Sequence, residues 1–248
     1  HRKTGLYSYQ YAVANFIRYY PDIEGVVPFR HVMERLMLAL HVPTYVHSGM
    51  VSRLSVLIAK AMLETCPELF VGLLDVASAE EAERRRDELL DFIRLAGLFH
   101  DVGKFYCLDV ITQYSRRLFD DEFDIIKLHA ECGYSILSLH RSTAAFAEVA
   151  LMHHITYDRQ GGYERSFMLE PETVPIVSDI VRIADSVDAA TDNIGRCYAA
   201  CKTLPTVMGE LVGSPKSYHP RIVSALCTSK MQRRLERMLT EGREKIYE

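Results

Sequence analysis

The most informative part of this chain is Leu98-Phe99-His100-Asp101-Val102-Gly103-Lys104, which sets a histidine directly beside a carboxylate. A second string, Leu151-Met152-His153-His154, sets two histidines side by side. Each pair follows an apolar run with helical spacing, and Gly103 is expected to end the first of these helices. Imidazole and carboxylate groups bind divalent metals such as iron, manganese and zinc. We therefore expect metal ligands at the ends of helices.

Three more potential ligands lie elsewhere in the chain. His47 follows Tyr45-Val46, His129 follows Lys127-Leu128, and Asp185 lies in the apolar stretch 180–190. A buried carboxylate needs a cation or several hydrogen-bond donors. Taken singly, each residue also fits a structural role, as a satisfied core histidine or a capping aspartate. Together the seven groups indicate a site with more than one metal, as used to hydrolyse phosphoesters.

Composition narrows the class of protein. The 248 residues are 48% hydrophobic, which is enough for one substantial core. The net charge of -4 argues against binding to duplex nucleic acid. No apolar run approaches the roughly 20 residues that span a bilayer, and the first residues lack a secretory signal. The six cysteines show no disulfide pattern, so we expect reduced thiols and a cytoplasmic location.

Helical periodicity runs through most of the chain and predicts an all-α bundle. Ser78 and Glu81 have capping-box spacing at the start of one helix, whose charged first half is expected to face solvent. The stretch 159–174 contains Gly161-Gly162 and is expected to be a loop. The expected helices cover 7–20, 31–41, 44–64, 78–99, 122–140, 143–155, 173–194 and 229–247.

The order of these motifs resembles the HD superfamily of metal-dependent phosphohydrolases, and within it the HD-GYP branch of bacterial cyclic-dinucleotide phosphodiesterases. The similarity covers about residues 40 to 228. It implies an HD-domain helical bundle with metals between facing helices, formed by residues 31–248 and preceded by an N-terminal helix or linker over 1–30. The matching strings are His100-Asp101-Val102-Gly103-Lys104, His129-Ala130-Glu131-Cys132-Gly133, His153-His154, Ile183-Ala184-Asp185-Ser186-Val187-Asp188-Ala189 and Tyr218-His219-Pro220-Arg221-Ile222-Val223.

The resemblance also implies a role for each residue. Asp101 would bridge two metals and act in catalysis together with Lys104. The metals would be iron or manganese, with zinc, nickel and magnesium as alternatives. The first metal would take His47, His100, Asp101 and Asp185, and the second would take Asp101, His129, His153 and His154. The substrate would contact Lys104, Tyr163, Arg196 and Lys202.

Three positions depart from the family pattern. Glu164 stands where the GYP motif has proline, and Ala199 stands where an RPYR-like string has its second arginine. Pro43 stands one helical turn before His47, where members with three metals carry a glutamate. Proline offers no side-chain oxygen, so we expect a two-metal site.

The leading interpretation is a phosphodiesterase that hydrolyses cyclic di-GMP or a related cyclic dinucleotide. One alternative is an HD phosphohydrolase for another nucleotide or small phosphoester, and another is a signalling domain that binds metal or nucleotide without turnover. The expected partner is a small nucleotide substrate. A homodimer and a fused sensory domain both stay open. The opening residues, His1-Arg2-Lys3-Thr4, are expected to come from within a longer chain.

Overall fold

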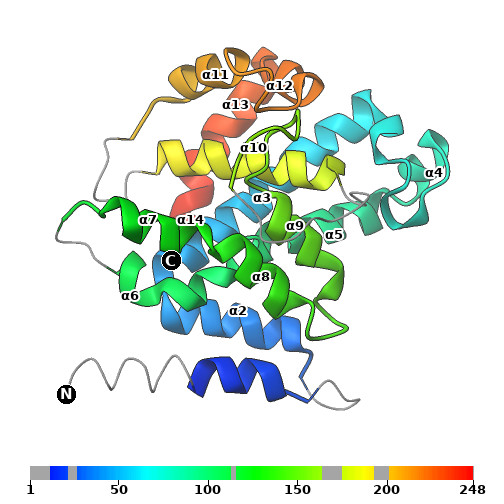
Figure 1. Ribbon diagram of the computed structural model, residues 1–248. Coiled ribbons are helices and arrows are strands. Elements are labelled where there is room, and N and C mark those ends of the chain that lie inside the picture. The colour runs from blue at the N-terminus through cyan, green and yellow to red at the C-terminus, as the bar shows by residue number, and fades with distance from the viewer. Residues whose placement is uncertain (1–11, 22–26, 113–115, 164–174, 193–200, 248) are drawn as a thin grey trace.

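A computed structural model of the chain describes residues 12–21, 27–112, 116–163, 175–192 and 201–247. In these ranges all regular elements are helical, which confirms the expected all-α class (Figure 1). A first helical segment covers 12–19. The α-helices that follow are α2 (Phe29–Leu40), α3 (Val42–Thr65), α4 (Ala79–Arg84), α5 (Arg86–Phe99), α6 (Leu108–Ile111), α7 (Asp120–Lys127), α8 (His129–Leu137), α9 (Ala147–Met152), α10 (Pro175–Thr191), α11 (Leu204–Val212), α12 (Pro220–Leu226), α13 (Ser229–Arg237) and α14 (Arg243–Tyr247). Shorter 3-10 or π elements are η1 (Pro67–Phe70), η2 (Leu73–Asp75), η3 (Val102–Cys107), η4 (Ala144–Phe146) and η5 (Met238–Gly242).

Helix α3 forms the centre of the bundle. It packs against α2, α5, α10, α12 and α14. Met50, Leu54, Ile58 and Met62 follow one another at intervals of four residues and are all buried. A helix surrounded in this way buries most of its surface and holds its side chains in fixed positions. His47, near its start, therefore lies inside the bundle and not on its surface.

Several expected long helices are interrupted in the structure. The helix expected over 78–99 divides at Arg85, which has φ -94 and ψ 19. The helix expected over 122–140 divides at Leu128, so that His129 begins a new helix. The helix expected over 143–155 is α-helical only in α9, and that over 229–247 contains the π-helix η5. Helical periodicity continues through such short breaks, because one non-helical residue barely changes which side chains are apolar.

Besides the single turn α6, two helices were not expected from the sequence, namely α11 and α12. Each begins with a side-chain cap followed by proline. Thr203 accepts a hydrogen bond from the Thr206 amide, and His219 accepts one from the Arg221 amide. Proline in the first helical turn is a signal for a helix start that does not depend on apolar periodicity. Within the described ranges, no helix is both long and apolar enough to cross a bilayer.

Candidate metal centre

The seven expected ligands come from five parts of the bundle and meet at one place. His47 lies on α3, and His100 and Asp101 lie between α5 and η3. The other four come from the green and yellow elements of Figure 1. His129 begins α8, His153 and His154 follow α9, and Asp185 lies on α10. Five of the seven are buried, and His154 and Asp185 are partly exposed.

Asp101 lies between two groups of histidines. Its Oδ2 is 3.5 Å from His47 Nε2 and 3.5 Å from His100 Nε2. Its Oδ1 is 3.2 Å from His129 Nε2 and 4.0 Å from His153 Nε2. The two oxygens of one carboxylate therefore face two different sets of imidazole nitrogens. This is the arrangement that a bridging ligand requires.

The remaining contacts complete two compact sets. Asp185 Oδ1 lies 3.0 Å from His47 Nε2, and Asp185 Oδ2 lies 4.0 Å from His154 Nδ1. His129 Nε2 lies 3.3 Å from His153 Nε2 and 3.2 Å from His154 Nε2. Ligand atoms of His47, His100 and Asp185 lie within 4.8 Å of one another, as do those of His129, His153 and His154.

Three of the histidines are oriented by the backbone. In each of them Nδ1 lies within hydrogen-bond distance of the carbonyl oxygen three residues earlier. A carbonyl can only accept, so Nδ1 carries the proton and the Nε2 lone pair is left for a metal. The pairs are His100 with Gly97 at 2.8 Å, His129 with Ile126 at 2.6 Å, and His153 with Ala150 at 2.8 Å.

Electrostatics keep these groups in the form that binds metals. Burial lowers the pKa of His100, and burial with the neighbouring histidines holds the pKa of His153 well below its usual range. Burial lowers the pKa of His154 to about 3. Burial alone would raise the pKa of Asp101, but Lys104 and the nearby histidines hold it well below its usual range. These three histidines are neutral and Asp101 is charged at neutral pH, as metal ligation requires.

His47 lies beside three carboxylates, those of Asp101, Asp185 and Asp188. Burial lowers its pKa, but hydrogen bonds to Asp185 and Asp188 outweigh that effect and raise the pKa to about 9. The carboxylates therefore attract positive charge to this point, whether a proton or a metal ion.

The residues present fit a divalent metal. The Nε2 atom of His100 is buried and makes no hydrogen bond. The Nε2 atoms of His129 and His153 face each other, although each ring already carries its proton on Nδ1. Buried acceptors turned toward one another are unfavourable without a shared donor or cation. A metal ion would satisfy both observations.

Gly103 has a different role from the one expected. Helix α5 ends at Phe99, four residues earlier, and Gly103 is not needed to end it. A Cβ at Gly103 would lie 1.9 Å from the carbonyl oxygen of His129 and 2.4 Å from the amide nitrogen of Gly133. The absence of a side chain therefore lets η3 approach α8, which brings Asp101 within reach of His129.

A cleft of about 550 Å³ opens onto the centre. The ammonium of Lys104 contacts Asp101 at its wall. The ring of Tyr163 lies 4.1 Å from that of His154, centroid to centroid, with an interplanar angle of 31°. Among the lining residues that were not expected from the sequence are three basic side chains, His41, Arg116 and Arg117. Arg116 and Arg117 are adjacent in the sequence and lie between the His100-Asp101 pair and His129. This pair of positive charges could have been used to predict a contact with a phosphate substrate.

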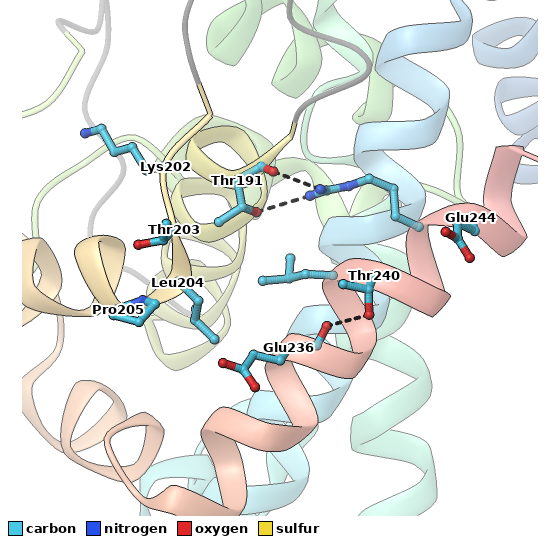
Figure 2. Close-up of a pocket in the computed structure, with 10 residues that line it drawn as sticks. Thr191, Lys202, Thr203, Leu204, Pro205, Glu236, Thr240 and Glu244 are labelled. Atoms are coloured by element: carbon cyan, nitrogen blue, oxygen red, sulfur yellow. Dashed lines mark hydrogen bonds between the residues drawn. The ribbon is translucent and has the colours of Figure 1, made fainter.

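One expected substrate residue, Lys202, is not brought to the cleft. Lys202 lines a separate pocket (Figure 2). Its ammonium lies 2.7 Å from a carboxylate oxygen of Glu210. The position of Lys202 therefore does not support the expected contact with the substrate. Arg196, Glu164 and Ala199 lie outside the described residues.

The residues of this centre lie in a stretch of the chain that matches a known protein family. The HD domain family model matches residues 44–190. The chain belongs to this family. The match includes all seven of the clustered residues, and it confirms the resemblance drawn from the order of the motifs. It ends before α11, so the last four α-helices of this HD protein lie beyond it.

Curated relatives of this HD domain carry related names. A cyclic di-GMP phosphodiesterase of Thermotoga maritima is 35% identical over 62% of the chain and 41% of its own length. The cyclic di-GMP phosphodiesterase response regulator RpfG of Xanthomonas campestris is 30% identical over 59% of the chain and 38% of its own length. The 3'3'-cGAMP-specific phosphodiesterase 2 of Vibrio cholerae is 32% identical over 55% and 26%. The chain thus matches less than half the length of each relative.

Proposed function

We propose that this HD domain is a metal-dependent phosphodiesterase that opens a cyclic dinucleotide, such as cyclic di-GMP, at a site holding two divalent metals. The observation that carries the proposal is the position of Asp101, whose two oxygens face two separate sets of histidines. The relatives named as cyclic-dinucleotide phosphodiesterases support the choice of substrate class.

The proposed metal ligands form two sets that share Asp101. His47, His100 and Asp185 would hold one cation, His129, His153 and His154 would hold the other, and Asp101 would join them. When bound, such cations lower the pKa of a water between them and offset negative charge on the phosphate. We propose iron or manganese, because both accept imidazole and carboxylate ligands. We further propose that 31–248 acts as one catalytic unit, since α12 and α14 pack on α3.

Two residues that line the cleft, Lys104 and Tyr163, would bind the substrate. The Lys104 ammonium already contacts a carboxylate beside the expected metals, so it would also reach a non-bridging phosphate oxygen. Tyr163 lies with its ring tilted against His154 at the cleft wall and offers a face on which a base would stack. Lys104 would therefore fix the phosphate, and Tyr163 would fix the base.

The test is to load the purified protein with manganese or iron under controlled conditions and count the metals by elemental analysis. Hydrolysis is then followed for cyclic di-GMP, cyclic GMP-AMP, linear dinucleotides and mononucleotides. We expect at least two metals per chain and cleavage of a cyclic dinucleotide. One metal or fewer per chain after loading would contradict the site. Cleavage restricted to mononucleotides would move the assignment to another HD phosphohydrolase.

The products give a second test. Pro43 lies at the start of α3 and lines the cleft without a side-chain oxygen, so no third ligand set is expected there. We expect the first cut to be easier than the second, and the linear dinucleotide to accumulate in a chromatographic time course. A Pro43→Glu variant supplies a carboxylate at this position and should raise the yield of mononucleotide. Prompt formation of mononucleotide by the unaltered protein would contradict the prediction.

A further inference from the structure

A buried arginine in the last helix, Arg243, contacts Asp188 beside the proposed metal centre. Arg243 begins α14, beyond the stretch that matches the HD family, and only 4% of its surface is exposed. Its Nη2 donates to Asp188 Oδ1 at 2.6 Å and to Thr191 Oγ1 at 3.2 Å. Its Nη1 donates to the Thr191 carbonyl oxygen at 2.9 Å. The guanidinium is therefore held by three hydrogen bonds at the end of α10, and its Nε lies 4.0 Å from Asp192 Oδ1.

Asp188 connects Arg243 to His47, one of the proposed metal ligands. Asp188 is 1% exposed, and its second oxygen, Oδ2, accepts a hydrogen bond from His47 Nδ1 at 2.7 Å. The opposite nitrogen of the same ring, Nε2, faces Asp101 and Asp185. His100, His129 and His153 are oriented by backbone carbonyls, whereas His47 depends on a side chain for its orientation.

We propose that Arg243 is a positioning residue for His47, acting through Asp188. A buried carboxylate with no cation beside it is unfavourable and would turn toward other donors. Arg243 holds one oxygen of Asp188 and so leaves the other aimed at His47, which fixes the ring with its Nε2 toward the metals. Partners of this kind commonly contribute to metal affinity. The inference rests on the proposed metal site and adds the C-terminal segment to it.

The segment directly before Arg243 is a π-helix, and it leads the chain to the contact between Arg243 and Asp188. Residues Met238–Gly242 form a π-helix, a wide turn often found at functional sites. Arg53 on α3 donates to the Gly242 carbonyl oxygen at 2.9 Å and so ties this turn to the bundle. Arg53 is exposed and touches the same turn without contacting Asp188, so it offers a matched control.

A pocket gives access to Arg243 from outside. It measures about 410 Å³ and includes Arg243 in its lining together with Thr191, Thr240 and Glu244 (Figure 2). Figure 2 shows these three labelled residues arranged around the pocket. Removing the Arg243 side chain would enlarge this pocket toward Asp188. A small guanidinium ion could then occupy the place of the missing side chain.

The first experiment measures manganese affinity by competition with a chelator, together with the thermal midpoint. We expect Arg243→Ala and Asp188→Asn each to weaken binding by about 10- to 100-fold. The double variant should bind no more weakly than Asp188→Asn alone, because Arg243 acts through Asp188. Arg53→Ala should keep the affinity of the unaltered protein. Additive losses in the double variant, or full affinity in Arg243→Ala, would overturn the role of Arg243.

The second experiment is chemical rescue. Millimolar guanidinium chloride should restore part of the affinity of Arg243→Ala, whereas sodium chloride at equal ionic strength should not. Absence of rescue together with full loss in Arg53→Ala would show a general loss of packing and overturn the proposal. If Arg243→Ala does not fold, Arg243→Lys takes its place, and unchanged affinity there together with full affinity in Asp188→Asn would overturn it. Failure of the unaltered protein to bind metal would overturn the proposed function itself, and this role with it.

Discussion

Asp101 and Lys104 touch each other, yet at the residue scale they should have separable effects. Asp101 offers oxygens to both histidine sets, so Asp101→Ala should lose both metals and all turnover while the chain stays folded. An ammonium cannot be a ligand, so Lys104→Ala should keep its metals and lose activity. Elemental analysis and a hydrolysis assay of both variants measure this. Equal loss of metal from both would contradict separate roles.

The lowered pKa of His41 predicts that the free energy of unfolding depends on pH. It caps α3, and its Nδ1 accepts from the Thr44 amide at 3.2 Å. Burial and the nearby Lys104 lower its pKa to about 4, from an ordinary value of 6.5. As the pH falls between these values, the unfolded chain binds a proton at His41 that the folded chain does not. The free energy of unfolding must therefore fall with pH in this window.

The His41→Asn variant tests that sign. Asparagine is a good N-cap and does not titrate, so it keeps the cap and removes the proton linkage. We expect the unaltered protein to lose more unfolding free energy than the variant between pH 6.5 and about 4. Urea unfolding of both proteins across this range measures the difference. Parallel losses would show that His41 titrates normally in the folded chain.

At the scale of elements, the contact between η3 and α8 brings together the two ligand sets of the proposed metal centre. A Cβ at Gly103 would overlap the His129 carbonyl oxygen, so Gly103→Ala must push these elements apart. We expect a loss of about 1–3 kcal/mol of stability, as for other overpacked positions. Metal affinity should fall with it, because Asp101 and His129 would move apart. Urea unfolding and chelator competition measure the two effects.

Gly209 in α11 is the matched control for Gly103. Nothing lies within 4 Å of a Cβ built there, and the residue is exposed on a helix. Gly209→Ala should therefore raise stability by up to about 1 kcal/mol, since alanine favours a helix more than glycine does. Metal affinity should stay unchanged. A loss at Gly209 similar to that at Gly103 would contradict the close-approach explanation.

At the scale of the whole molecule, the proposed metals would link α3, the α5–η3 junction, α8, α9 and α10. Ligands that bind only the folded state stabilise it by mass action, by about 2.7 kcal/mol at a hundred times the dissociation constant. We therefore expect chelator to lower the thermal midpoint by roughly 5–10 °C for a chain of this size. Calorimetry measures the shift. Asp101→Ala should show no further shift with chelator.

Much of this protein could be predicted from its sequence. Apolar residues at helical spacing predicted an all-α bundle, because that spacing follows from the geometry of the helix itself. The histidines and aspartates were recognisable because buried groups of this chemistry need a cation. Adjacent ligands such as His153 and His154 are also close in space for the simple reason that they are neighbours in the chain.

The rest depended on contacts between residues far apart in the sequence. The helix breaks at Arg85 and Leu128 leave the apolar pattern almost unchanged, so local periodicity could not reveal them. Lys202 carries the right charge for a phosphate, but its place was set by the packing of the C-terminal helices and its pairing with Glu210. The link from Arg243 to Asp188 spans 55 positions of the sequence, and the link from Asp188 to His47 spans 141. The sequence by itself determined which side chains could bind a metal, because that is a property of each side chain. Only the tertiary structure decided which of them meet and what orients them, because these depend on how the helices pack.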